Sequence, residues 1–340
     1  MKFPKMLPLL FLLSFSTALF AQDPVAADAD TSKWKVEGFG ATTINQVSFT
    51  NWAAGGDNSI SFALKAFMTA RYNSGRHHWD NGFNAEYGLL WTKAEGMRKN
   101  EDKIELETKY GYDINKKKTL LLSALGNFKS QFANGYNYPN DSIEISKFAS
   151  PGYLTLALGI DWKPKDYFSV FVSPVTGKIT FVTDQYLANT GIYGNEAGVA
   201  ALENGQPKID TTTGRVIFTA DGEKVLFQFG AYLNARFQKE VVKNITVVSK
   251  LELFANYMGD TPEEKMIDVN WETALLFNIN EWFAASLTLN LIYDKQTRIA
   301  KDENEDGKIE LNEFDDRVQF KEALGLGLTY KFNNKKEPKP

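Results

Sequence analysis

The chain has 340 residues and a nearly balanced charge, with 38 Lys and Arg against 42 Asp and Glu and a formal net charge of −4. The absence of cysteine excludes disulfides, thiolate metal sites, catalytic thiols and a lipidated-cysteine anchor. Nucleic acid is not expected as a partner, because phosphate binding needs a concentrated positive surface. The mean hydropathy of −0.32 is that of an ordinary soluble protein. The aromatic content of 14%, with 25 Phe, 14 Tyr and 7 Trp, is unusual.

The N-terminal segment has the composition of a secretory signal. Residues 1–21 combine Lys2 and Lys5 with an apolar run and small residues ending at Ala21, after which we expect cleavage. About fifteen apolar residues are too few for a helix that spans a bilayer, which needs about twenty. Residues 22–33 are rich in Ala and Asp and predict a flexible lead. An exported chain with this leader is either soluble outside the cytoplasm or inserted in a membrane as strands.

Beyond the leader, apolar and polar residues alternate with a period of two. In residues 225–237 every second side chain is apolar, beginning with Val225, Phe227 and Phe229, and the residues between them are polar or small. Successive side chains of a strand point to opposite faces, so this pattern predicts a strand with one apolar and one polar face.

The same period marks about twelve segments, of which only the first is irregular. They are residues 34–49, 60–72, 83–91, 104–112, 120–128, 154–162, 168–172, 225–237, 245–257, 267–277, 283–293 and 318–332. Soluble strands usually run about five or six residues, whereas tilted strands that cross a bilayer need about nine to eleven. The length of most of these segments therefore favours the membrane.

The connections between these segments alternate in length. Short ones are predicted at residues 74–79, 115–118, 163–166, 239–244 and 280–282, and long ones at 94–102, 133–153, 176–223, 259–265 and 294–317. This alternation is typical of outer-membrane barrels, whose short turns are periplasmic. The sequence thus predicts an all-β fold: a transmembrane, antiparallel, up-and-down β-barrel of the outer membrane of a Gram-negative bacterium. The barrel domain is expected over residues 34–332 and a short periplasmic tail over 333–340. A soluble β-sandwich or jelly roll is the alternative.

Three segments carry a resemblance to a known family. Residues 47–58 (VSFTNWAAGGDN), 173–178 (SPVTGK) and 326–332 (LGLTYKF) are similar to an uncharacterised family of outer-membrane barrels found in Bacteroidota, domain of unknown function 3078. The resemblance implies fold and location and no activity. The final strand ends on Phe332, as in outer-membrane proteins generally, which implies recognition by the barrel-assembly machinery. Glu322 departs from the otherwise apolar face of that strand.

A twelve-residue loop matches the calcium-binding loop of an EF-hand. Its ligand positions are Asp302, Asn304, Asp306, Lys308 through its carbonyl, Glu310 and Glu313, with Gly307 at the sixth position. Such a loop holds a hard cation with several oxygens, and the Gly makes the sharp turn that brings them round it. The flanking helices of an EF-hand are missing, because predicted strands lie on both sides. The sequence predicts a structural Ca²⁺ clip on an external loop, and an acidic solvated loop is the alternative.

The predicted inner face carries charges of both signs. They are Lys65, Arg71, Glu86, Glu105, Glu107, Lys109, Asp161, Arg236, Lys250, Glu252, Asp268 and Glu272. A barrel of about twelve strands is wider than one that side chains fill alone, so a narrow pore is expected. Passage of a small solute is the leading hypothesis, and outer-membrane lipid is an expected partner. A non-conducting structural or partner-docking barrel is the alternative.

Catalysis is not expected. An external hydrolase would need a histidine beside its nucleophile, whereas His77 and His78 belong to a short turn, interpreted as solvated, away from the long loops. The placement of two further segments stays open. Residues 52–56 are either a tight turn or a piece folded into the lumen, and the long connection over 176–223 either constricts the lumen or covers its mouth.

Overall fold

The computed structural model describes most of the chain after its leader. The described residues are 33–47, 59–93, 95–136, 141–259, 266–297, 299–300, 314–315 and 318–334. The chain divides into two units, residues 1–32 and 33–340, and every described residue belongs to the second. The predicted signal at 1–21, the segment at 52–56 and the calcium loop at 302–313 lie outside the described residues.

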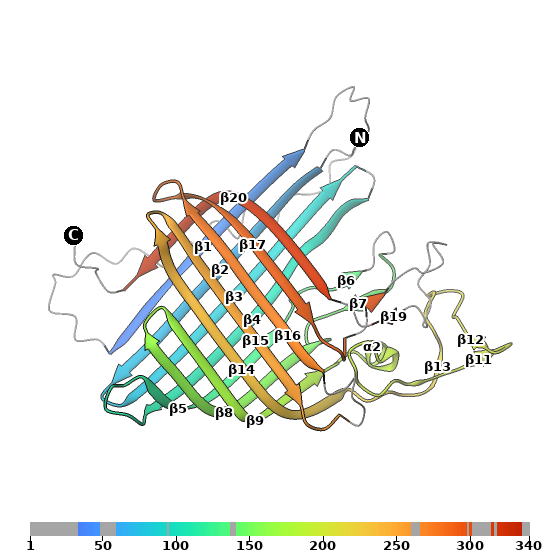
Figure 1. The fold of residues 1–340 in the computed structure, drawn as a ribbon. Coiled ribbons are helices and arrows are strands. Elements are labelled where there is room, and N and C mark those ends of the chain that lie inside the picture. The colour runs from blue at the N-terminus through green and yellow to red at the C-terminus, as the bar shows by residue number, and fades with distance from the viewer. Residues whose placement is uncertain are drawn as a thin grey trace. The chain divides into compact units, whose positions relative to one another are not determined.

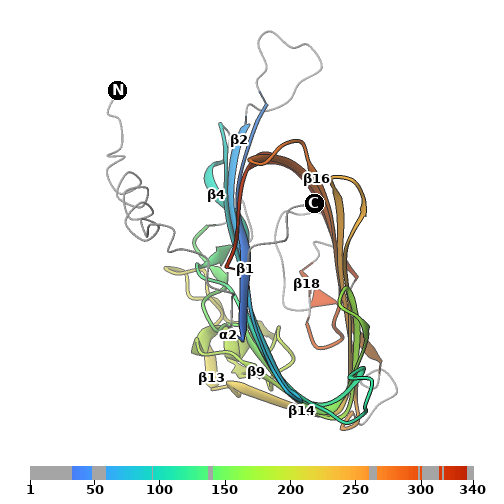
Figure 2. The ribbon, with the colours of Figure 1, turned by 90° about the vertical axis from the view of Figure 1, so that its left-hand side faces the viewer.

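Twelve long strands form a closed barrel, which confirms the predicted fold class. In ring order they are β1 (Trp34–Val47), β2 (Ser59–Ser74), β3 (His77–Thr92), β4 (Gly96–Asp113), β5 (Leu120–Ser130), β8 (Gly152–Lys165), β9 (Phe168–Phe181), β14 (Val225–Val242), β15 (Ile245–Asn256), β16 (Ile267–Asn278), β17 (Phe283–Tyr293) and β20 (Gln319–Asn333). Each strand pairs antiparallel with its neighbours, and β20 returns to pair with β1 (Figure 1). Figure 2 shows the wall as an elongated ring, with β2 and β4 on one long side and β16 on the other.

The alternating pattern places apolar side chains outside and charged ones inside. On β2 and β3, for example, Phe62 lies beside Leu89 on the outer face, whereas Lys65 lies beside Glu86 on the inner face. The outer apolar side chains are exposed: Leu324 is 72% and Phe320 62% exposed. A soluble protein rarely exposes a continuous apolar surface of this kind, which suits contact with lipid.

An aromatic row crosses the outer face at the short-turn end of the barrel. The register aligns Trp34, Tyr72, Trp79 and Tyr110 on four adjacent strands. The ring centroids of Trp34 and Tyr72 are 5.3 Å apart, and those of Trp34 and Trp79 are 5.7 Å apart. Trp and Tyr have an apolar body and a polar edge, so rows of them favour a membrane interface.

The connection between β3 and β4 differs from its prediction. The sequence predicts a long loop over 94–102, but β4 begins at Gly96 and continues pairing with β3 through a bulge at Gly88. Lys99 of this stretch has partners both within the strand and outside it. Lys99 donates to Asp102 over 2.8 Å and to the carbonyl of Ala133 over 2.8 Å. Charge therefore does not mark a loop here.

The connection between β9 and β14 folds into a small lobe at the long-loop end of the barrel. The lobe contains the helix α2 (Gln185–Thr190) and the hairpin strands β10 (Val199–Ala200), β11 (Leu202–Glu203), β12 (Gln206–Pro207) and β13 (Phe218–Ala220). Val182, Leu187, Ala188 and Tyr193 form its apolar core. Both ribbon views place it outside the ring of strands (Figures 1 and 2), so it does not constrict the lumen.

Closure of the barrel brings the β20 backbone very near to β1. A Cβ atom at Gly327 would lie 1.9 Å from the carbonyl oxygen of Thr42, closer than any side chain tolerates. We therefore expect Gly327→Ala to lower the fraction of chain that closes into a barrel. Heat-dependent mobility in gel electrophoresis measures that fraction, since a closed barrel and an unfolded chain migrate differently.

Gly40→Ala is the matched control, because a Cβ at Gly40 on β1 meets only the carbonyl oxygen of Lys65, at 3.9 Å. Equal folding of the two variants would contradict the close approach at Gly327.

Candidate functional site: the barrel interior

Every charged side chain predicted to face inward does so and is paired. The pairs are Lys65 with Glu86, Arg71 with Glu37, Lys109 with Asp161, Lys250 with Glu105 and Glu252, Arg236 with Glu107, Lys103 with Glu272, and Lys178 with Asp268. Within each pair, the opposite charge of the partner compensates the free-energy cost of burying the charged group. The interior is therefore a network of ion pairs.

The centre of this network is Glu105 on β4. Its carboxylate accepts hydrogen bonds from the Lys250 ammonium over 2.6 Å and from the Asn127 amide over 2.8 Å. The Nζ atom of Lys103 lies 3.3 Å from the same carboxylate. Several donors around one carboxylate stabilise its ionised form in a site of low dielectric.

A second carboxylate, Glu252 on β15, completes the network. It accepts a hydrogen bond from the hydroxyl of Tyr232 over 2.5 Å and one from the amide of Asn270 over 3.1 Å, and it pairs with Lys129. Four carboxylates and four cations make up this middle layer. They are Glu105, Glu107, Glu252, Glu272, Lys103, Lys129, Lys250 and Arg236. The layer is electrically neutral.

These ion pairs cross the lumen. Lys103 on β4 donates to Glu272 on β16 over 2.6 Å, and these strands are the fourth and tenth of the twelve in ring order, hence opposite each other. Lys250 on β15 reaches Glu105 on β4 in the same way. The two long walls of the ring in Figure 2 are thus joined through their side chains.

The inner face is packed unevenly. On the strands β4, β5, β8, β9, β14 and β15, which we call the packed side, many inward side chains are buried, and they include the apolar cluster of Leu125, Ala157, Phe171, Tyr232 and Phe254. On β17, β20 and β1, which we call the open side, no described inward side chain is fully buried. Their inward residues are mostly short, such as Ser286, Thr288 and Gly325.

Two further charged layers lie nearer the ends of the barrel. Toward the short turns, Lys109 lies 2.7 Å from Asp161, and Lys163 lies 2.7 Å from Asp80. Toward the long loops, Lys178 on β9 binds both Asp268 and Asp294, each over 2.8 Å. Charge compensation therefore extends along the whole packed side.

The two histidines begin β3 and lie directly after the turn at Gly75 and Arg76 rather than within it; His77 is exposed, as the interpretation expects, and His78 is half-buried. His77 faces outward and shares a hydrogen bond of 2.6 Å with the hydroxyl of Tyr110. His78 faces inward, where its Nε2 lies 2.9 Å from the fully buried carboxylate of Asp113. Both rings are held by their neighbours because strand pairing extends to residue 77.

Three of the long connections meet one another at the long-loop end of the barrel. A Cβ atom at Gly194, in the lobe, would lie 2.6 Å from the Cβ of Gln296, which follows β17, so the two backbones are in close contact. The Tyr193 hydroxyl donates to the carbonyl of Ile145 over 2.5 Å. Burial, together with the charge of Tyr153, raises the pKa of Tyr193, which keeps its hydroxyl protonated as a donor.

The N-terminus of α2 attaches the lobe to the barrel rim. The carboxylate of Asp184 caps α2 by accepting from the Leu187 amide over 3.0 Å and binds the Lys147 ammonium over 2.8 Å. Burial alone would raise the pKa of Asp184, but these two hydrogen bonds outweigh it and lower the pKa below its usual value. The ionised carboxylate is thus the form that holds the lobe.

The described segments hold neither a cluster of metal-ligating side chains nor a membrane-spanning helix. They contain no group of three or more His, Asp or Glu side chains arranged to hold a metal ion. No helix among them has the length and apolar character to cross a bilayer. The proposed ligands Asp302 to Glu313 belong to the undescribed part, so the calcium loop stays a prediction.

Several members of the network are not among the inward residues predicted from the sequence. Lys103 and Lys129 lie just outside the predicted strands, and Lys178 lies beyond the predicted end of its strand at residue 172. Continuing the period of two past the predicted ends would have found Lys103 and Lys129, which keep the inward parity of their strands, whereas a bulge in β9 shifts the parity before Lys178. The sequence of a single strand does not indicate which partner each of these lysines binds across the lumen.

Comparison with known proteins gives one family match. The model of a protein family of unknown function, DUF3078, matches residues 44–136. This range contains the 47–58 segment on which the sequence resemblance partly rests, whereas 173–178 and 326–332 lie outside it. A source in Bacteroidota stays a prediction. None of the curated proteins matches the chain.

Solved structures similar to this chain include membrane barrels at low identity. An outer membrane channel of Pseudomonas putida F1 is 12% identical, with a TM-score of 0.39, and the match covers 92% of this chain and 100% of that one. The translocator domain of the autotransporter NalP from Neisseria meningitidis is 6% identical, with a TM-score of 0.36 and coverage of 90% of each chain. The NanC porin is 8% identical, with a TM-score of 0.36 and coverage of 87% and 98%.

The network predicts a large cost for removing one cation. Lys250→Met leaves the buried carboxylate of Glu105 without its nearest cation, so we expect a loss of about 3–5 kcal/mol in the free energy of unfolding. Denaturant unfolding in detergent micelles, followed by tryptophan fluorescence, measures this. Lys208→Met is the control, because Lys208 is 46% exposed and its pair with Glu203 spans 3.8 Å. We expect that variant to change stability by less than about 1 kcal/mol. Similar losses for both would show that the cross-lumen pairs add little.

The lowered pKa of Asp184 predicts that acid loosens the lobe. The carboxylate stabilises α2 fully above the pKa of about 4 of an unfolded Asp, and this contribution is lost as the pH falls through the lower folded pKa. We expect the protection of residues 185–190 against hydrogen exchange, corrected for intrinsic rates, to decrease below pH about 4. Asp184→Asn keeps a capping oxygen without the titration, so its protection should not vary over the same range. Equal pH dependence in both proteins would contradict the assignment.

Proposed function

We propose that the protein spans the outer membrane of a Gram-negative bacterium and passes small solutes along the open side of its lumen. The observation that carries this proposal is the uneven packing of the interior. Leu121 and Asn127 on β5 are 1% and 2% exposed, whereas Lys321 on β20 is 44% exposed. A path through the barrel would therefore run beside β17, β20 and β1, off the barrel axis.

The charge balance of the lumen bears on the solutes that such a path would take. The middle layer holds as many carboxylates as cations, and Lys321 on the open side is paired with Glu101. The short side chains of the open side, Ser286, Thr288 and Gly325, are uncharged. A neutral wall attracts neither sign of ion over the other. The proposal therefore includes weak selectivity between cations and anions and a preference set by solute size.

Conductance across a planar bilayer tests this path. We expect wild-type protein to give small channel events with a reversal potential near zero in a salt gradient. Ser286→Trp places a large side chain inside the open side and should lower the single-channel conductance. Ala285→Trp is the matched control, because Ala285 directly precedes Ser286 on β17 and faces outward. No channel events in any protein at any voltage would rule out the conducting path.

The cross-lumen ion pairs also favour a second candidate function. Lys103 with Glu272 and Lys250 with Glu105 join opposite walls, and a lumen fully closed in this way would make a structural or partner-docking barrel without conduction. The exposed lobe would then be the part offered to a partner. The absence of conductance in inserted, folded protein would favour this function over the first.

The acidic loop over 302–313 adds a structural calcium clip to the proposal. Its support is the oxygen side chains at Asp302, Asn304 and Asp306 and the acidic residue Glu313 at the last position, in a connection between β17 and β20. We expect Ca²⁺ to protect this connection from protease, and Asp302→Ala with Glu313→Ala to abolish that protection. Equal cleavage of wild type with Ca²⁺ and with chelator would refute the clip.

A further inference from the structure

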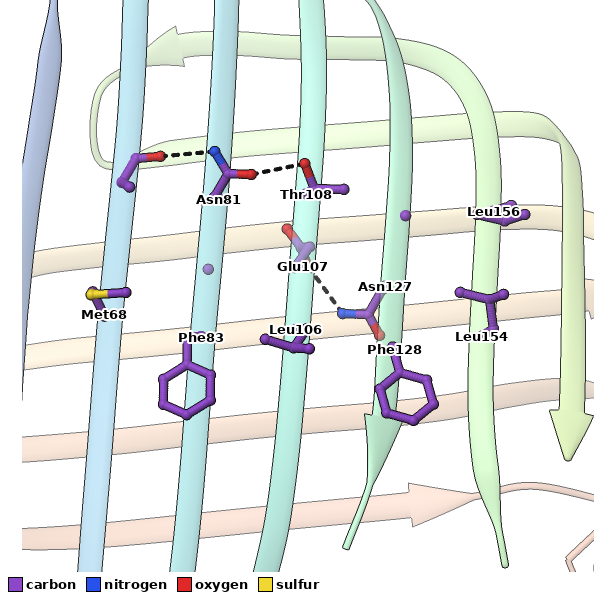
Figure 3. Close-up of a pocket in the computed structure, with 13 residues that line it drawn as sticks. Met68, Asn81, Phe83, Leu106, Glu107, Thr108, Asn127, Phe128, Leu154 and Leu156 are labelled. Carbon is purple, nitrogen blue, oxygen red and sulfur yellow. Dashed lines mark hydrogen bonds between the residues drawn. The ribbon is translucent and has the colours of Figure 1, made fainter. Parts of the chain in front are cut away.

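The outer face of the barrel carries a hollow of about 500 Å³ on the wall formed by β2, β3, β4, β5 and β8. Bulky apolar side chains surround it. They are Met68, Phe83, Leu106, Phe128, Leu154 and Leu156 (Figure 3). The hollow exists because a row of short outward residues, Ala70, Asn81, Thr108 and Gly126, crosses four neighbouring strands between rows of large ones.

Two of these short residues are polar, although they face outward. Thr108 accepts a hydrogen bond from the indole of Trp79 over 2.8 Å and donates to the amide oxygen of Asn81 over 2.9 Å. The amide nitrogen of Asn81 donates to the carbonyl of Ala70 over 3.4 Å. Figure 3 shows Asn81 held between these two neighbours.

This arrangement leaves Asn81 with a donor to spare. A side-chain amide has two N–H groups, and within the described barrel only the bond to Ala70 uses one. The amide cannot turn away, because Thr108 holds its oxygen. In a medium without water, an unused donor is costly, so the site favours a ligand that brings an acceptor together with apolar bulk.

The depth of Asn81 identifies the acceptor. Trp79 belongs to the aromatic row, and such rows lie at the level of the lipid headgroups. Asn81 is the next outward residue of β3, about 5 Å deeper for a tilted strand. Ester carbonyls lie at this level, between the headgroups and the hydrocarbon. The acyl chain that continues from such an ester would then enter the apolar hollow.

We propose that this hollow is a phospholipid-binding site, in which Asn81 donates to an ester carbonyl and the acyl chain packs over Gly126 between Leu106 and Leu156. The inference rests on the proposed membrane insertion of the barrel and is independent of conduction. The ligand is a phospholipid of the leaflet that faces the short turns.

Photo-crosslinking in vesicles tests the site. Phosphatidylethanolamine with a diazirine on its acyl chain is incorporated into phosphatidylethanolamine and phosphatidylglycerol vesicles, and labelled residues are mapped by mass spectrometry. We expect Phe83 to be labelled more than Leu289, an outward residue of β17 that lies equally far from its strand's short-turn end. Flotation of the vesicles first establishes that the protein is inserted.

Two variants separate the apolar part of the site from the polar part. Gly126→Leu fills the hollow, since a Cβ there would lie 3.5 Å from Thr108 and 3.6 Å from Leu156, and it should remove the excess labelling at Phe83. Ala124→Leu, two residues away on the same outer face, should leave it unchanged. Asn81→Leu should lower the labelling about fivefold, the ratio for loss of one neutral hydrogen bond. Because an ether lacks the carbonyl, we also expect the wild type to be labelled more by the ester phospholipid than by its ether analogue, and Asn81→Leu should abolish that difference.

The outcomes distinguish the two proposals. Protein that does not float with the vesicles would overturn membrane insertion and, with it, the lipid site. Inserted protein with equal labelling at Phe83 and Leu289, or labelling unchanged by Gly126→Leu, would overturn the lipid site alone. Crosslinks between two chains through the hollow would show that a second copy occupies it, which also overturns the lipid site.

Discussion

The pairing of β20 with β1 is the contact on which the rest of the structure depends. A membrane-spanning sheet has no water to satisfy the backbone groups of a free edge, so an open sheet of these strands would leave unpaired N–H and C=O groups in hydrocarbon. β20 pairs with β17 along one edge and with β1 along the other, from Glu37 opposite Asn333 to Thr43 opposite Gly327. Gly327 allows the two backbones to approach where a Cβ would collide with Thr42, and Gly38 leaves room for the ring of Phe332.

Closure of the barrel also determines where the charged side chains lie. Once the ring is closed, one face of every strand shares a single interior, and residues far apart in the sequence become neighbours. Lys103 and Glu272 are 169 residues apart and donate and accept one hydrogen bond. Long Lys, Arg and Glu side chains span a twelve-stranded lumen that shorter apolar ones would leave empty. Because each cation meets a carboxylate, the layer stays neutral, and its side chains fill the interior between the walls.

Most of the fold could be predicted from the sequence, because alternation with a period of two depends only on neighbours along the chain. The predicted segment 283–293 coincides with β17. The failures occur where that period is interrupted. β9 was expected to end at residue 172, yet it continues to Phe181 through a bulge at which the Ser173 hydroxyl donates to the carbonyl of Leu158. The bulge shifts the parity, so Lys178 faces inward and was missed. The pairing across the lumen depends on the ring as a whole and could not be predicted from any segment.

The ion-pair network and the outer hollow lie on opposite faces of the same strands. Glu107 and Asn127 point into the ion-pair network, while their neighbours Thr108 and Gly126 line the outer hollow. Ion pairs that join opposite walls hold these strands in place, so the hollow has a fixed shape, as a specific lipid site requires. On the open side Lys321 of β20 also reaches Glu101 of β4, but the short side chains of Ser286 and Gly325 border the space that a solute would use. The charged residues that dominate the interior therefore determine where a solute cannot pass, and the small uncharged ones determine what size of solute can.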